Sequence, residues 1–345
     1  MRYMIIRTVA YPRAALVGNP SDGYHGKTIA FVFDNYRAEV MVYETPELEI
    51  LASRRDYTRF DSLEAMHRDI EQFGYYGGIR LLKAAGKKFF EYCRNHQLEV
   101  AEKNFTIRYN SDIPNRLGLA GSSAIITAAM RAMFKFYDLT IDPAHLANLV
   151  LSTERDELGI PAGLQDRVAQ AYNTPVFMDF DREYMQKYGV GKYDPIEIPE
   201  DLNLYVAYRT DLAEGSEILH GRLRDDYEAG VPAVLDAMQE WASLTEQVAD
   251  SLKKHDFAAV AKALDRNFDL RCKVCSDSIS PKNRGMVETA RRCGASAKFT
   301  GSGGAIIGTY QDEEMFNKMK QEFAKSSVEL IKPRIVKMGE QDVCP

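Results

Sequence analysis

Alternating apolar and polar residues predict short strands in the first third of the chain. Residues 3–10, 28–33 and 36–43 have this pattern, and residues 105–109 repeat it with Phe, Ile and Tyr at every second position. Between the first two of these runs, residues 12–24 are so rich in Pro, Gly, Asn and Asp that they are expected to form a loop. The sheet-forming part of the chain therefore begins close to its N-terminus.

Apolar residues at helical spacing predict several helices. The expected helical segments are 70–93, 125–136, 143–159, 234–252, 257–271 and 281–293. Strands are expected at 176–180 and 202–208, and strands and helices that alternate in this way predict an α/β plait in the C-terminal half. The polar, irregular stretch 182–199 is the expected boundary between an N-terminal domain, 1–190, and a C-terminal domain, 191–345.

Composition and charge exclude several classes of protein. The 345 residues are 45% hydrophobic and 27% charged, as in ordinary globular domains, and the net charge is −6. An acidic chain has no basic field for nucleic acid or for an anionic membrane. The first residues contain charges too close together for a signal peptide, and no apolar run reaches the length of a membrane span. Five scattered cysteines favour a reduced, cytoplasmic setting. As a separate expectation, the chain is a monomer or a homodimer.

A glycine-rich turn between a strand and an apolar helix is the first candidate for chemistry. Gly118 and Gly121 allow close approach of the backbone to a ligand, and the helix that follows presents unpartnered N–H groups and partial positive charge. Such a turn can cradle phosphate. Ser122 and Ser123 could cap the helix, and one hydroxyl could reach a phosphate-bound Mg²⁺. From these residues alone, a capped helix without a ligand is an equally good interpretation.

The turn resembles the phosphate loop of the GHMP kinase superfamily, whose pattern is Pro-x-x-x-Gly-Leu-Gly/Ser-Ser-Ser-Ala. It is not a P-loop, because it contains no Gly-Lys-Ser or Gly-Lys-Thr. The matching residues are Pro114, Gly118, Leu119, Ser122, Ser123 and Ala124, with Ala120 and Gly121 as an extended centre. The resemblance implies that this set binds ATP.

A second motif contains two carboxylates twelve residues apart, Glu154 and Asp166, and is similar to the Glu…Gly-x-(x)-Asp pattern of the same kinases. Asp166 after a Gly-Pro-Gly turn could be only a helix cap. The resemblance implies instead that Glu154, with Ser123, holds Mg²⁺ and that Asp166 is catalytic. It also implies that Arg13 keeps Asp166 ionised and steadies the transferring phosphoryl group.

Two further segments complete the family pattern. Arg13, Leu16, Gly18 and Asp22 fall on the sugar-facing motif, but Asn19-Pro20 replaces the Glu-His of galactokinases, which argues against galactose. The run 298–304 resembles the motif Lys-x-Thr-Gly-(Ala/Ser)-Gly-Gly-Gly. The substrate-binding residues implied by these segments are Asp22, Asp166, Gly301, Ser302 and Gly303.

The chain is therefore expected to have the α+β, two-domain GHMP kinase fold, with a ribosomal-protein-S5-like N-terminal domain and a ferredoxin-like α/β plait in the C-terminal domain. Within the superfamily it most resembles the glucuronokinases of plants and their bacterial relatives, on the phrases at 13–24, 118–125, 162–170 and 267–271. That implies phosphorylation of D-glucuronate to glucuronate 1-phosphate with ATP and Mg²⁺. Lys27, Arg222 and Arg271 are candidates to bind the substrate carboxylate. A kinase for a heptose phosphate, galactose or phosphomevalonate, and a non-catalytic ligand-binding relative, are the alternatives.

Overall fold

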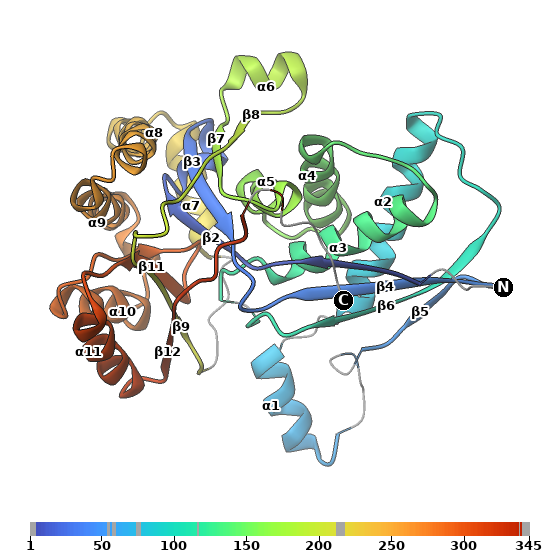
Figure 1. Cartoon of the computed structure of the whole chain (residues 1–345), viewed down its shortest axis with the longest axis horizontal. Coiled ribbons are helices and arrows are strands. Elements are labelled where there is room, and N and C mark those ends of the chain that lie inside the picture. Colours follow the sequence, from blue (N-terminus) through green and yellow to red (C-terminus); the bar gives the residue numbers. More distant parts are fainter. Residues whose placement is uncertain are drawn as a thin grey trace.

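The computed structural model describes residues 5–53, 56, 60–73, 77–115, 117–211, 218–337 and 339. The side chains at 69, 71–73, 218–222 and 277 fall outside this description. Within the described residues the chain forms three four-stranded sheets with helices packed around them (Figure 1).

The first sheet supports the helix that follows the glycine-rich turn. In spatial order its strands are β1 (Ile5–Ala10), β4 (Ala38–Thr45), β6 (Asn104–Ser111) and β5 (Glu49–Leu51). Only β5 and β6 of this sheet run parallel. Helix α3 (Gly121–Phe136) packs on β1 and β4, where the Thr8 hydroxyl donates to the carbonyl of Ala128 at 2.7 Å. Because α3 is apolar nearly all round, it is also covered on its other side, by α2 (Gly78–Asn95).

The second sheet carries the sugar-facing motif. Its strands, in order, are β2 (Arg13–Val17), β3 (Lys27–Val32), β7 (Val176–Asp179) and β8 (Lys192–Pro195). Figure 1 shows this sheet between α5 (Leu164–Tyr172) and α8 (Pro232–Lys253). The prediction of a loop throughout 12–24 was wrong, because residues 13–17 form β2. All five are buried, so the strand has no alternating pattern that periodicity could detect.

The third sheet confirms the plait predicted for the C-terminal half. Its antiparallel strands lie in the order β10 (Lys298–Phe299), β11 (Ala305–Thr309), β9 (Leu204–Arg209) and β12 (Val328–Ile331). The helices that accompany this sheet are α9 (Phe257–Val274), α10 (Pro281–Arg292) and α11 (Glu313–Ala324). A strand order of 2-3-1-4 with these crossovers is that of a ferredoxin-like plait. The α+β fold class is therefore confirmed.

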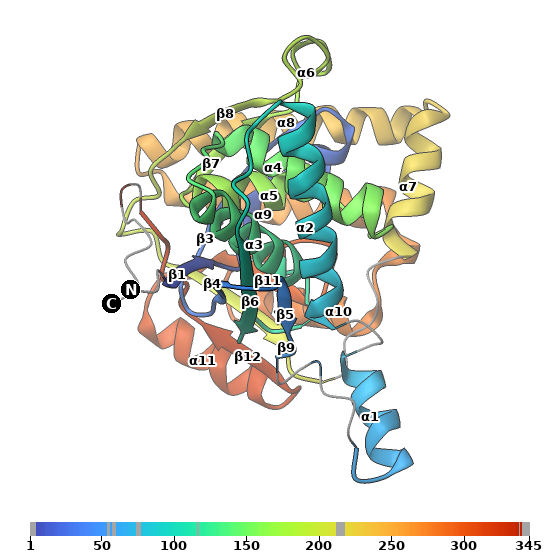
Figure 2. The same cartoon turned by 90° about the vertical axis from the view of Figure 1, so that its right-hand side faces the viewer.

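Several boundaries differ from the sequence expectation. The helix expected at 70–93 is two helices, α1 (Leu63–Phe73), which projects from the body in Figure 2, and α2. The helix expected at 143–159 is α4 (Pro143–Ser152) followed by a π-helical turn, Thr153–Glu157. In the described residues that follow β12, strand pairing is limited to an isolated bridge from Ile335 to Phe33. The remaining helices are α6 (Arg182–Tyr188) and α7 (Ile218–Glu228).

The predicted domain boundary near residue 190 stays a prediction. Strand β8 pairs with β7, so residues 192–195 continue the second sheet rather than start the C-terminal plait. None of the described helices combines the length and the apolar character that a bilayer crossing requires.

Candidate functional site

An ion pair between Arg13 and Asp166 lies where the four predicted motifs meet. Arg13 opens β2, is 4% exposed, and donates from Nη2 to Oδ1 of Asp166 in the first turn of α5. Its Nη1 donates to the carbonyls of Gly118, at 3.3 Å, and Thr300. One guanidinium therefore joins the sugar-facing motif to the carboxylate and to both glycine loops.

The surroundings of Asp166 keep its carboxyl group ionised. Burial alone raises the pKa of this group, but the charges of Arg13 and Arg167 outweigh burial and hold the pKa below its usual value. Nη1 of Arg167 lies 3.1 Å from Oδ2 of Asp166. Each carboxylate oxygen therefore faces one guanidinium, and the negative charge is fixed in place.

Glu154 is held by Arg167, which the sequence did not single out. Glu154 is 1% exposed on the π-helical turn, and its Oε2 accepts from Nε of Arg167 at 2.6 Å and also from Nη2. Burial raises the pKa of Glu154 against the opposing effect of Arg167. Oε1 of Glu154 takes part in no hydrogen bond among the described residues. One oxygen of this carboxylate is thus engaged and the other is not.

The predicted phosphate loop forms a left-handed turn at the start of α3. Ala120, with φ of 61°, is the N-cap residue, and no side chain caps the helix. The expectation that Ser122 or Ser123 caps it was wrong, since the Ser123 hydroxyl donates instead to the carbonyl of Ala120, at 3.0 Å. Within the described part of the chain, the N–H groups of the first turn therefore have no side-chain acceptor, as a phosphate cradle requires.

Two glycine loops meet backbone to backbone beside this turn. Gly118 has φ of +67°, and a Cβ there would lie 2.8 Å from the carbonyl oxygen of Gly303. A Cβ on Gly301 would lie 2.9 Å from the carbonyl oxygen of Gly118 and 3.2 Å from Nη1 of Arg13. Only glycines allow this approach, which explains why both motifs are rich in them. The structure thus places Gly301, Ser302 and Gly303 against the phosphate loop.

The sugar-facing motif is fixed by helix α9. The side-chain oxygen of Asn267 accepts from the N–H of Gly18 at 2.7 Å, and its Nδ2 donates to the carbonyl of Asn19 at 3.0 Å. Asn267 is 1% exposed, so this anchor is buried. Asp22 follows on a 3₁₀ turn, Ser21–Tyr24, and faces the start of α5: a Cβ on Gly163 would lie 2.8 Å from Oδ2 of Asp22.

Asp22 is prone to hold a proton. Burial, followed by the charge of Asp166, raises the pKa of Asp22 from 3.8 to about 7. The folded protein therefore keeps a proton on Asp22 at pH values between these two, where the unfolded chain has lost it, and stability falls as the pH rises through that window.

We expect Asp22→Asn to remove this pH dependence. The free energy of unfolding of the variant should exceed that of the wild type by about 2–3 kcal/mol more at pH 8 than at pH 5. Trp241 is the single tryptophan of the chain and is fully buried, so its fluorescence reports unfolding. Urea unfolding followed in this way gives the free energy of unfolding of each protein at each pH. The same difference at both pH values would contradict the raised pKa.

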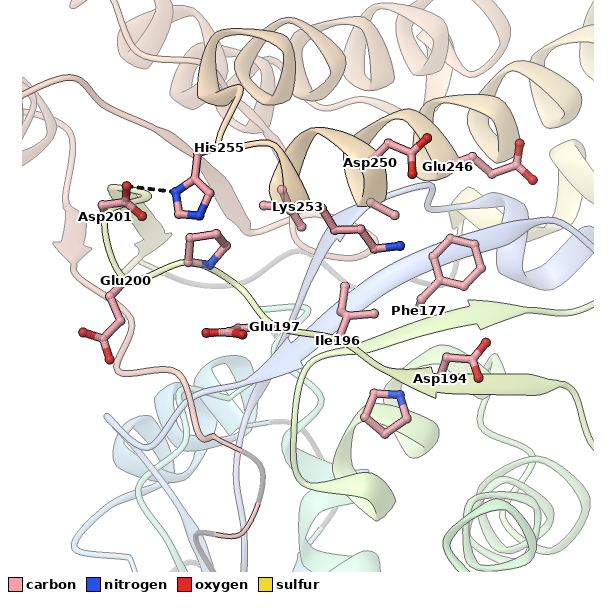
Figure 3. A pocket seen from close by; sticks show the side chains of 14 residues that line it. Phe177, Asp194, Ile196, Glu197, Glu200, Asp201, Glu246, Asp250, Lys253 and His255 are labelled. Atoms are coloured by element: carbon pink, nitrogen blue, oxygen red, sulfur yellow. Dashed lines mark hydrogen bonds and ion pairs between the residues drawn. The ribbon is translucent and has the colours of Figure 1, made fainter.

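A cavity of about 1000 Å³ lies away from these residues. Figure 3 shows it bordered by β8, the segment that follows β8 and the end of α8, and none of the predicted site residues lines it. Its charged lining is mostly acidic: Asp194, Glu197, Glu200, Asp201, Glu246 and Asp250. A surface of this charge repels phosphates and carboxylates, so it is not the candidate site.

Arg271, which the sequence offered as a candidate for the substrate carboxylate, is 2% exposed. Three further buried polar residues of the site, Arg167, Asn267 and Lys298, were not singled out from the sequence and lie at 5%, 1% and 1% exposure. Each of these residues belongs to a segment that resembles the family, and this membership is the one sequence feature that could have pointed to them. Their partners, however, are backbone N–H and carbonyl groups or a distant carboxylate, which spacing along the chain does not reveal.

Comparison with known proteins identifies the class to which this fold and site belong. Sequence models described as "GHMP kinases N terminal domain" and "GHMP kinases C terminal" match residues 80–174 and 248–328. The chain belongs to the GHMP kinases. The sequence prediction of the superfamily is therefore confirmed.

Two plant proteins resemble nearly the whole chain. "Probable glucuronokinase 2" of Arabidopsis thaliana is 37% identical over 329 residues, covering 94% of this chain and 89% of the relative. "Glucuronokinase 1" of the same plant is 38% identical, covering 86% and 83%. Among solved structures, galactokinase of Lactococcus lactis has a TM-score of 0.74 at 14% identity, covering 96% of this chain and 94% of the other. That similarity supports the fold.

Proposed function

We propose that this GHMP kinase transfers the γ-phosphoryl group of ATP to the anomeric hydroxyl of D-glucuronate, giving glucuronate 1-phosphate. The observation that carries the proposal is the Arg13–Asp166 ion pair set between two interlocked glycine loops. The names of the two Arabidopsis relatives support glucuronate as the acceptor.

ATP would bind at the start of α3. Its phosphates would accept hydrogen bonds from backbone N–H groups between Gly118 and Ser123, where the helix dipole adds partial positive charge. Pro114, Leu119 and Ala124 complete the predicted set, and the N–H of Arg13 donates to the carbonyl of Leu119 at 3.1 Å. The nucleotide site is thus joined to the reacting centre through β2.

The Ser123 hydroxyl and Glu154 are suitable ligands for Mg²⁺, which prefers oxygen and keeps several waters and phosphate oxygens in its shell. Oε1 of Glu154 fits this role, because Arg167 engages Oε2 alone. When bound, the ion supplies positive charge that neutralises the phosphates during transfer. Arg167 then fixes the carboxylate from the opposite side.

Asp166 would orient the sugar hydroxyl and accept its proton late. A carboxylate whose pKa lies below the usual value is a weak base. Phosphoryl transfer through a loose transition state needs little activation of the nucleophile, so a fixed acceptor with weak basicity is sufficient. Arg13, which borders both the carboxylate and Gly118, would offset the negative charge of the transferring group.

The sugar would lie between Asp22 and the loop Gly301–Gly303. Asp22 would bind sugar hydroxyls, and backbone groups of Gly301, Ser302 and Gly303 would line the opposite side of the substrate. We further infer a cytoplasmic monomer or homodimer without nucleic-acid or membrane partners.

A coupled ADP-release assay across uronic acids, hexoses, heptose phosphates and mevalonate derivatives tests this function. We expect D-glucuronate to be the best substrate, with a kcat/KM that exceeds that for the neutral hexoses by about 100-fold or more, because a site built for a charged group discriminates strongly against substrates that lack it. A heptose phosphate, galactose or phosphomevalonate as the best substrate would replace glucuronate. No turnover of any compound, with ligand binding retained, would favour a non-catalytic binding protein.

A further inference from the structure

Two buried cations of the site have no anionic partner among the described side chains. Nζ of Lys298 donates to the carbonyl of Ala15 at 2.7 Å. Arg271 donates from Nη1 to the carbonyl of Gly301 at 2.8 Å and from Nη2 to that of Ser302 at 3.0 Å. By contrast, the buried Arg13 and Arg167 each contact a carboxylate. A buried cation without a counter-ion is costly, so its presence requires a reason.

Arg271 retains a free donor. Its Nε is buried and has no hydrogen-bond partner among the residues that the structure describes. Burial lowers the pKa of Arg271 to about 10, which reflects how poorly backbone carbonyls replace water around the charge. A planar guanidinium with free N–H groups is the geometry that binds a carboxylate with two hydrogen bonds.

Arg271 also lies close to the reacting centre. It holds the carbonyl of Gly301, and the other side of Gly301 faces Arg13, whose Nη1 would be 3.2 Å from a Cβ there. A single backbone segment thus separates Arg271 from the Arg13–Asp166 pair. The charge of Asp22 acts on Arg271 as well, so the predicted sugar-binding residue lies within electrostatic range.

The chemistry of a uronic acid matches this arrangement. In the pyranose form, the carbon with the reacting hydroxyl and the carbon with the carboxylate are both bonded to the ring oxygen. If the anomeric hydroxyl of the sugar contacts Asp166, the carboxylate of the same sugar therefore lies close enough to Asp166 to be bound by a neighbouring side chain.

The other cations proposed for this role are less suitable. Lys27 is bound to Glu246 and lies 3.6 Å from Asp179, so its charge is already offset. The side chain of Arg222 lies outside the described residues. For Lys298, burial and the charges of Arg271 and Arg13 hold the pKa well below its usual value, and its ammonium group offers no planar pair of donors.

We propose that Arg271 is the specificity-determining residue that binds the carboxylate of the sugar acid, with the substrate supplying the counter-ion that the protein lacks. This inference rests on the proposed function, since it concerns the same substrate.

The test compares D-glucuronate with D-glucuronamide, its neutral isostere, in the wild type and in Arg271→Gln. We expect the variant to lose about 100-fold in kcat/KM for glucuronate, because a buried charge pair is lost, and only a few-fold for glucuronamide. The KM for ATP should be unchanged. Arg271→Lys, which keeps the charge without the planar fork, should regain part of the loss.

Arg266→Gln is the matched control, because Arg266 lies on the same helix but is exposed and paired with Glu240. This variant should leave kcat/KM unchanged for both glucuronate and glucuronamide. Equal losses for glucuronate and glucuronamide in Arg271→Gln would overturn the inference and would leave Arg271 as a residue that only positions the glycine loop.

If Arg271→Gln does not fold, wild-type binding decides the question. Titration in the absence of ATP should give a dissociation constant at least about tenfold lower for glucuronate than for glucuronamide, and equal constants would overturn the inference.

Turnover by the wild type separates the inference from the proposed function. If the wild type phosphorylates glucuronate, and a folded Arg271→Gln still prefers glucuronate to glucuronamide as strongly, only the inference fails. If the wild type does not phosphorylate glucuronate, the proposed function fails and the inference fails with it.

Discussion

Asp166→Asn should lower kcat by about 10³-fold while leaving the KM for ATP nearly unchanged. Asparagine keeps the size of the side chain and an oxygen that can accept from Arg13. It removes the fixed negative charge that, in the proposed mechanism, orients the sugar hydroxyl and accepts its proton. The ATP phosphates are expected on the first turn of α3, whereas Asp166 lies on α5. Steady-state kinetics with ATP and D-glucuronate varied separately measure both effects.

Asp156→Asn is the matched control for this substitution. Asp156 lies two residues after Glu154, but its side chain is 50% exposed and its partner is the adjacent, exposed Arg155. An exposed pair contributes little, so the control should retain wild-type kinetics. If Asp166→Asn turned over glucuronate within a few-fold of the wild type, Asp166 would be a structural partner of Arg13 and not a catalytic residue.

The parts of the site that sequence reasoning could predict are those encoded in short segments. The turn at Gly118 and the run around Gly301 are recognisable because each needs glycine where its backbone meets the other loop, and that need leaves a local pattern. Helices such as α8 and α9 were predictable for a similar reason, since their apolar residues repeat at helical spacing.

What sequence reasoning missed depends on contacts between distant segments. Strand β2 is buried throughout, so its residues do not alternate, and its neighbouring turn residues suggested a loop. Arg167 follows the predicted aspartate directly, yet its partner Glu154 is thirteen residues away across a π-helical turn. Sequence reasoning named Arg271 as one of three candidate cations but could not place it, because it binds backbone carbonyls, which every residue possesses and no sequence pattern marks.

Arg13→Gln should lower both activity and stability. Without Arg13, Arg167 is the one cationic neighbour that Asp166 keeps among the described residues, and a buried carboxylate is left partly uncompensated. Removing one member of a buried pair costs about 3–5 kcal/mol, and the remaining contact with Arg167 should keep the loss near the lower limit. The glycine loops also lose their shared donor to Gly118 and Thr300, so kcat/KM should fall by about 10³-fold. Urea unfolding followed by Trp241 fluorescence, together with the kinetic assay, measures both changes.

A double-mutant cycle separates the ion pair from the other contacts of Arg13. If the cost of Arg13→Gln comes from an uncompensated charge, adding Asp166→Asn should restore about 1–3 kcal/mol of the lost stability without restoring any activity. The same cycle on the exposed pair Arg155 and Asp156 should give a coupling below about 1 kcal/mol. Additive losses at Arg13 and Asp166 would mean that the carbonyl contacts, and not the carboxylate, account for the burial of Arg13. Because the proposed chemistry needs an aspartate held ionised by its neighbour, that result would remove the electrostatic basis of the mechanism even if the enzyme proved to phosphorylate glucuronate.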